Sequence, residues 1–148
     1  EPQKGKTQLE YNRRYYQEIL DVVKAYKDYS ILGHLDVIKR YDLNGEIELE
    51  KIKDLIEQIF EVVIADGKGI ELNTSSRAYH LKSLMPSREI LELYHDMGGK
   101  IITIGSDAHN ADRVGDRVME SQKILKEIGF NGIYTFDQMK PKFHEFKF

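Results

Sequence analysis

The stretch KIITIGSDAHNADRVG, residues 100–115, decides the fold predicted for this chain. Its β-branched run IITI predicts a short buried strand that ends at Gly105, because such residues pack well on a pleated sheet. Asp107 and His109 follow directly. In α/β folds, ligands bind at the carboxyl ends of the strands. A carboxylate beside an imidazole suits zinc, iron or manganese, although a helix-capping Asp and a surface His give the same pattern.

The composition narrows the class of protein. The chain has 148 residues, of which 41% are hydrophobic, and a net charge of -3, which suits one domain with a real core. It has no cysteine, which excludes disulfides, thiolate metal sites and cysteine nucleophiles. Acidic and basic residues are interspersed, so we expect no nucleic-acid groove and no membrane-binding patch. The sequence has no apolar run long enough to span a bilayer and no apolar stretch typical of a signal peptide. We therefore expect a cytoplasmic setting.

Hydrophobic spacing predicts the order of the elements. Helical periodicity indicates four amphipathic helices, over residues 7–28, 49–63, 86–97 and 112–127. Short apolar runs indicate four strands, over residues 31–32, 70–73, 101–104 and 132–136. Helices and strands therefore alternate, which predicts an α/β fold of about four parallel strands covered by helices.

The helical periodicity also predicts which side chains of these helices are buried. The first would bury Tyr15, Ile19, Val22, Val23 and Tyr26. The last would bury an apolar face that begins with Val114 and Val118. The tail QMKPKFHEFKF, residues 138–148, has no clear pattern, and its phenylalanines are expected to pack back on the domain.

Two more strand ends carry polar side chains. His34 follows the first strand, and the segment from Asn73 to Arg77 follows the second. A lone His is more often a core residue, and an Arg forms a surface ion pair as readily as it binds a phosphate, but parallel strands bring their carboxyl ends to one edge. Arg also matches phosphate oxygens in a bidentate way. Imidazole, carboxylate and guanidinium at one edge predict a metal-assisted site for a phosphorylated or otherwise anionic substrate.

Four segments, ILGHLD, IELNTSSR, PSREILELY and GGKIITIGSDAH, resemble in order and spacing the C-terminal part of the polymerase and histidinol phosphatase (PHP) family, in its histidinol-phosphatase branch. The resemblance implies a distorted seven-stranded β/α barrel with up to three divalent metal ions at its carboxyl rim. It also implies a metal-dependent phosphomonoesterase of histidine biosynthesis that hydrolyses L-histidinol phosphate to L-histidinol and phosphate.

The resemblance assigns roles residue by residue. His34, Asp107 and His109 resemble metal ligands of the family, for a cluster of Zn, Mn or Fe. Arg77 resembles the arginine that holds the substrate phosphate. Asp107 and His109 are also the candidate catalytic residues, as relays of a proton to the leaving alkoxide. Glu71, Asn73 and His80 receive no ligand role.

The family's opening His-x-His, other histidines and a bridging Glu belong to an N-terminal half that is not in this sequence. About four strands cannot close a seven-stranded barrel. We therefore expect residues 1–148 to be the C-terminal portion of a single PHP domain. It would need the N-terminal half or a swapped copy of itself, and would have little activity alone.

Two other functions remain open on the sequence. The same chemistry could act on another small phosphate ester or on a phosphotyrosyl protein. Alternatively, the chain could be a non-catalytic assembly module, which the missing ligands favour.

Overall fold

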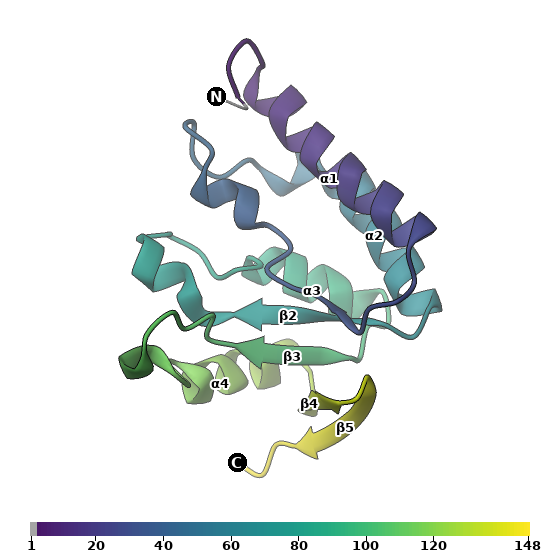
Figure 1. Cartoon of the computed structure of the whole chain (residues 1–148), viewed down its shortest axis with the longest axis vertical. Coiled ribbons are helices and arrows are strands. Elements are labelled where there is room, and N and C mark those ends of the chain that lie inside the picture. Colours follow the sequence, from purple (N-terminus) through teal and green to yellow (C-terminus); the bar gives the residue numbers. More distant parts are fainter. Residues whose placement is uncertain (1–2) are drawn as a thin grey trace.

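The sheet that carries the predicted site has three parallel strands in a computed structural model, which describes residues 3–148. Their order is β1 (Ile31–Leu32), β2 (Gly69–Asn73) and β3 (Ile102–Gly105). Asn73 is in register with Gly105, so β2 and β3 end side by side (Figure 1). The predicted α/β fold with parallel strands is confirmed for these three strands.

The helices of the described residues are α1 (Gln8–Ala25), α2 (Lys53–Ala65), α3 (Arg88–Asp96) and α4 (Val118–Ile128). Four short 3-10 turns also occur in residues 3–148: η1 (Val37–Arg40), η2 (Leu49–Lys51), η3 (Thr74–Tyr79) and η4 (Ala111–Arg113). No helix within residues 3–148 has both the length and the apolar character needed to cross a bilayer.

The core lies between the helices and one face of the sheet. Ile70, Leu72 and Ile102 are fully buried on the strands and belong to one hydrophobic cluster with side chains of all four helices. Successive strand residues point to opposite faces, so Glu71, between Ile70 and Leu72, points away from this core. The sheet therefore has an apolar side, which packs against helices, and a second side that carries a carboxylate.

Helix α1 differs from its predicted burial. Its buried residues are Asn12, Tyr16, Leu20 and Val23, whereas Val22 is 57% exposed. Tyr26 is also exposed, so the predicted face was wrong for these two residues. Several apolar residues lie close together on this helix, and only the packing against α2 decides which of them face the core.

The last helix begins later than predicted. Helix α4 starts at Val118, and Val114 is 76% exposed. Gly115 and Arg117 both have positive φ, at 74° and 60°, and a helix cannot continue through that conformation. The predicted helix over residues 112–127 was therefore wrong before Val118.

The fourth predicted strand does not join the parallel sheet. Strand β4 (Gly132–Asp137) pairs antiparallel with β5 (Lys140–Glu145) in a separate hairpin, seen at the yellow end of Figure 1. The predicted fourth parallel strand was wrong because the tail, whose pattern was undecided, supplies a nearer partner. Of the tail phenylalanines, Phe146 packs against the core, whereas Phe143 and Phe148 are about half exposed.

The carboxylate of Asp42 joins the start of the chain to the loop after η1. It accepts hydrogen bonds from Gln3 Nε2 at 3.0 Å, Gln8 Nε2 at 3.3 Å, Asn12 Nδ2 at 2.7 Å and the Asn44 N–H at 2.9 Å. Burial alone would raise the pKa of Asp42, but these hydrogen bonds together hold that pKa below its usual value. The ionised form is therefore favoured in the folded chain.

We expect Asp42→Ala to lower the free energy of unfolding by about 2 kcal/mol, because it leaves buried amide donors without an acceptor. Asp54→Ala removes an exposed ion pair with Arg13 and should lower it by about 0.5 kcal/mol. Urea unfolding at pH 7 measures both. Equal losses in the two variants would contradict this account.

The contribution of Asp42 to the free energy of unfolding should also depend on pH. Because the folded-state pKa of Asp42 is lowered, this contribution is present above the unfolded-state pKa of about 3.9 and is lost as pH falls through the folded-state pKa.

Candidate active site

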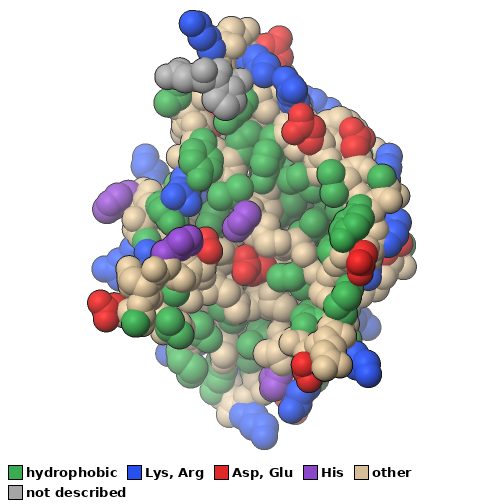
Figure 2. Space-filling model, viewed as in Figure 1, with side chains coloured by type: hydrophobic (Ala, Val, Ile, Leu, Met, Phe, Trp, Pro, Cys, Tyr) green, Lys and Arg blue, Asp and Glu red, His purple; other side chains and the backbone are tan. Residues whose placement is uncertain are grey.

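The three parallel strands end at one edge of the sheet. His34 follows β1, η3 follows β2 directly, and Asp107 and His109 follow β3. His34 and Asp107 both have positive φ, at 30° and 48°, so the backbone turns sharply at both strand ends. His34, Asp107 and His109 are exposed at this edge, and Figure 2 shows histidine side chains close to acidic ones in the middle of the face viewed.

Glu71, on the central strand, lies between the ends of its two neighbours. Its Oε1 accepts hydrogen bonds from the His34 N–H at 3.1 Å and from Asn73 Nδ2 at 3.1 Å. On the other side, a Cβ atom added to Gly105 would lie 2.3 Å from Glu71 Oε2. The carboxylate therefore occupies the space that a side chain at Gly105 would need, and it holds the backbone at His34.

The resemblance gave Glu71 no ligand role and left it a structural or supporting one. The strand alternation already placed it on the face opposite Ile70 and Leu72, and glycines end both neighbouring strands, at Gly33 and Gly105. Together these signals could have indicated a carboxylate between two strand ends, but the strand order is needed to connect them.

The ring of His109 is oriented by its own loop. Its Nδ1 lies 2.8 Å from the backbone carbonyl oxygen of Asp107. A neutral imidazole that donates its Nδ1–H to this oxygen carries its lone pair on Nε2. Histidines that bind metals are commonly oriented in this way by a carbonyl or carboxylate.

The polar segment after β2 stabilises its own turn. Asn73 Oδ1 accepts hydrogen bonds from the backbone N–H and the hydroxyl of Ser75. Thr74 donates its hydroxyl to the carbonyl oxygen of Asp116 at 2.7 Å, which fixes η3 to the loop after β3. These buried groups therefore hold the edge together and are not free donors for a ligand.

Arg77 remains available. Its side chain is exposed and forms no ion pair or hydrogen bond with any residue of the 3–148 range. It lines a cavity of about 590 Å³ together with Arg88 and Arg117, and those two arginines are already paired with glutamates. The free guanidinium in this cavity suits an anion such as a phosphate.

Three other histidines have different surroundings. His80 lines the same cavity as Arg77 and has φ of 56°. His95 packs edge-on against Phe130, with ring centroids 5.0 Å apart, and His144 Nε2 lies 2.7 Å from the Thr135 hydroxyl in the β4–β5 hairpin. Neither His95 nor His144 lies at the strand-end edge.

The donors at the edge suit a divalent metal in kind but not in number. Imidazole nitrogen and carboxylate oxygen are ordinary zinc ligands. Within the described part of the chain, however, no three His, Cys, Asp or Glu side chains are grouped closely enough to hold a metal ion. A complete metal site would therefore need further ligands from outside residues 3–148.

The PHP domain family model matches residues 1–75, which is half of the chain. The chain belongs to the PHP family. It is 35% identical over 118 residues to a Thermotoga maritima protein named "Probable histidinol-phosphatase", covering 80% of this chain and 48% of that protein. It is 30% identical over 138 residues to the histidinol-phosphatase of Lactococcus lactis, covering 91% of this chain and 51% of the relative. The chain thus spans about half the length of these relatives.

Solved structures of this PHP protein's relatives agree with the fold. The structure of histidinol phosphate phosphatase from Lactococcus lactis, in complex with zinc, L-histidinol and phosphate, matches with a TM-score of 0.81 at 27% identity. The match covers 96% of this chain and 54% of that one. A Listeria monocytogenes structure at 16% identity matches with a TM-score of 0.66 over 78% of this chain, which supports the fold alone.

Gly105→Ala should lower the free energy of unfolding by about 1–3 kcal/mol, because its Cβ would displace the Glu71 carboxylate. Gly33→Ala is the matched control on the other flank of Glu71, since its Cβ would lie 3.6 Å from Glu71 Oε1, an ordinary contact. The control should change stability by less than about 0.5 kcal/mol. Urea unfolding compares the two, and a larger loss for Gly33→Ala would contradict the placement of Glu71.

Proposed function

We propose that this chain is part of a metal-dependent phosphomonoesterase that hydrolyses L-histidinol phosphate to L-histidinol and phosphate. The observation that carries the proposal is the match over 96% of the chain to a histidinol phosphate phosphatase whose structure holds zinc, L-histidinol and phosphate. The exposed imidazoles and carboxylate that follow β1 and β3 support it, as does the unpaired guanidinium of Arg77 in the cavity beside the turn after β2. The substrate is accordingly a small phosphorylated molecule.

The roles follow from the chemistry of each side chain. His34, Asp107 and His109 would hold divalent metal ions of a cluster of up to three, and Arg77 would bind the phosphate. Bound metal ions supply positive charge toward the phosphoryl oxygens and make bound water more acidic. Attack of water on phosphorus breaks the ester P–O bond, and Asp107 or His109 would deliver a proton to the leaving alkoxide.

The proposed context is a seven-stranded PHP barrel of which residues 1–148 form the C-terminal portion. Two observations support this incompleteness: the chain spans about half of its relatives, and no three metal-binding side chains are grouped within residues 3–148. The remaining ligands would come from an N-terminal half or a swapped copy of the chain. The lack of a complete ligand set also favours, as a second candidate, a non-catalytic assembly role for this chain by itself.

Completion of the site is tested by phosphate release from L-histidinol phosphate with Zn²⁺ or Mn²⁺. We compare residues 1–148 with the same chain extended by the sequence that precedes it in its gene. The extended protein should turn over at least about 100-fold faster, because it would complete the metal site. A monomeric 148-residue chain that is fully loaded with metal and equally active would overturn the incompleteness. A preference for a phosphotyrosyl peptide or another phosphate ester would overturn the substrate.

In the extended protein, Arg77→Ala should raise the KM for L-histidinol phosphate about 10- to 100-fold, because it removes a charged hydrogen-bond donor to the phosphate. Arg77→Lys should recover part of this loss, since it keeps the charge but not the planar fork. Arg14→Ala, which breaks an exposed ion pair on α1, is the control and should leave KM unchanged. An unchanged KM in Arg77→Ala would remove this residue from the site.

A further inference from the structure

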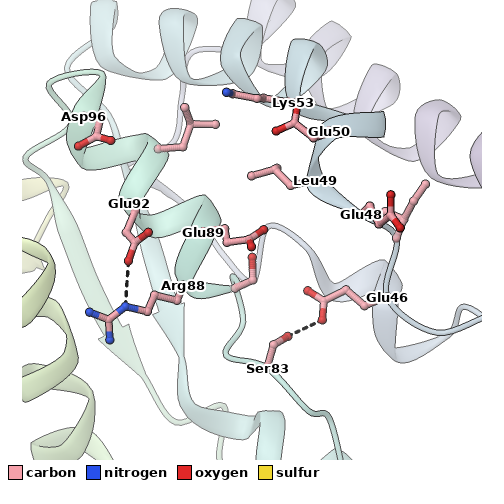
Figure 3. Close-up of a pocket in the computed structure, with 13 residues that line it drawn as sticks. Glu46, Glu48, Leu49, Glu50, Lys53, Ser83, Arg88, Glu89, Glu92 and Asp96 are labelled. Atoms are coloured by element: carbon pink, nitrogen blue, oxygen red, sulfur yellow. Dashed lines mark hydrogen bonds and ion pairs between the residues drawn. The ribbon is translucent and has the colours of Figure 1, made fainter.

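A second large cavity, of about 820 Å³, lies between the segment that contains η2 and helix α3. We call it the acidic groove. Figure 3 shows carboxylates from both of its walls around the central side chain of Leu49. The acidic residues that line it are Glu46, Glu48, Glu50, Glu89, Glu92 and Asp96.

Half of the six acidic side chains in the groove have no partner in the described chain. Glu48, Glu50 and Glu89 form no side-chain ion pair or hydrogen bond with other residues of the described chain. The two cations that line the groove are Lys53 and Arg88. Lys53 pairs with Glu57, and Arg88 pairs with Glu92 of the groove itself, so the carboxylates outnumber the cations. The groove therefore presents a concentrated negative potential to a ligand.

A buried, unpartnered oxygen lies in a small cavity that adjoins the acidic groove, and we call this small cavity the inner cavity. Asp36 lines the inner cavity, which has a volume of about 30 Å³ and shares Glu46, Leu49 and Glu89 with the groove. The Asp36 side chain is 3% exposed, and its Oδ1 has no hydrogen-bond partner within residues 3–148. Buried polar atoms are nearly always paired, so this oxygen points to a small donor in the inner cavity.

The other oxygen of Asp36 is fully used. Oδ2 accepts hydrogen bonds from Lys39 Nζ at 2.8 Å and from the Ser87 N–H at 3.0 Å. Asp36 is therefore held in place by the protein, and its Oδ1 is oriented before any ligand arrives. The inner cavity is large enough for one water molecule or one ammonium group. Its lining includes the Lys39 ammonium and three carboxylates, of Asp36, Glu46 and Glu89, so the carboxylates outnumber the cation there.

The residues that line the acidic groove determine which kind of cation fits it. Ile47, Leu49 and Leu93 give the acidic groove an apolar floor between its carboxylates. A compact divalent ion needs several oxygen ligands at one point, and no three acidic or histidine side chains of the described chain are grouped that closely. Spaced carboxylates over an apolar floor suit an extended ligand with methylene segments between its charges.

We propose that the acidic groove binds a linear aliphatic polyamine. Its methylene segments lie over Leu49 and Leu93, and its ammonium groups lie among the carboxylates of the two walls. One terminal ammonium enters the inner cavity and donates to Asp36 Oδ1. This site uses none of the residues proposed to bind the metal ions or the phosphate, and it does not depend on the proposed phosphatase activity.

The test is isothermal titration calorimetry of the 148-residue chain with spermidine at low salt. We expect saturable 1:1 binding that weakens as salt screens the carboxylates. The double variant Glu50→Gln/Glu89→Gln should weaken binding about 10-fold, since it removes one unpaired carboxylate from each wall. Glu61→Gln, on α2 but outside the groove, is the matched control and should change the affinity less than 2-fold, within the range of about ±0.5 kcal/mol for surface substitutions.

Asp36→Asn separates the inner cavity from general charge attraction. It should weaken spermidine more than it weakens tetramethylammonium, which is too large to enter the inner cavity, with folding checked by circular dichroism. If this buried variant does not fold, the groove variants still decide the matter. Absent saturable binding, equal loss in the control variant, or equal affinity for trilysine or Mg²⁺ would overturn the proposal.

Discussion

The Glu71 carboxylate lies between the strand ends on which the candidate site depends, and it accepts hydrogen bonds at two of them, from the His34 N–H and from Asn73 Nδ2. Glu71 accepts from the backbone of His34 on one side and fills the space beside Gly105 on the other. A charged acceptor is well suited to this place, because it pairs with a backbone N–H that the short strand β1 leaves free. The positive φ of His34 is thereby stabilised, and the exposed imidazole is held at the edge of the sheet.

Around this carboxylate, the edge is built from polar groups that serve one another. Asn73 and Thr74 are buried and spend their hydrogen bonds on the turn after β2 and on the loop after β3. The exposed side chains of His109 and Arg77 are not part of these hydrogen bonds. Within the described chain, the His109 ring contacts only the carbonyl oxygen that orients it, and Arg77 has no polar partner. Rigid inner groups and free outer groups are what a binding site for an anion and its metal ions requires.

The segment after β1 places two ionisable side chains, His34 and Asp36, in different surroundings. His34 belongs to the strand-end edge, whereas Asp36 turns inward and pairs with Lys39 in a buried salt bridge. Arg40, four residues after Asp36, does not pair with it and instead lies over the ring of Tyr79, 3.2 Å from its centroid. A single loop thus borders both the edge of the sheet and the acidic groove, and burial of the Asp36–Lys39 pair fixes their relative position.

The sequence by itself determined the alternation of helices and strands, the three strand ends and their polar residues, and the PHP family, because local periodicity and short motifs report local burial. The tertiary structure alone decided that residues 132–137 pair with the tail, that Val114 is exposed, and that Glu71 joins His34 to the Gly105 side. These outcomes depend on the partners that the residues meet in the folded chain: the tail that pairs with β4, the positive φ values at Gly115 and Arg117 that end the helix, and a strand order that places Glu71 between two glycines. Sequence spacing carries no information on such partners, because they are chosen by packing across the whole sheet.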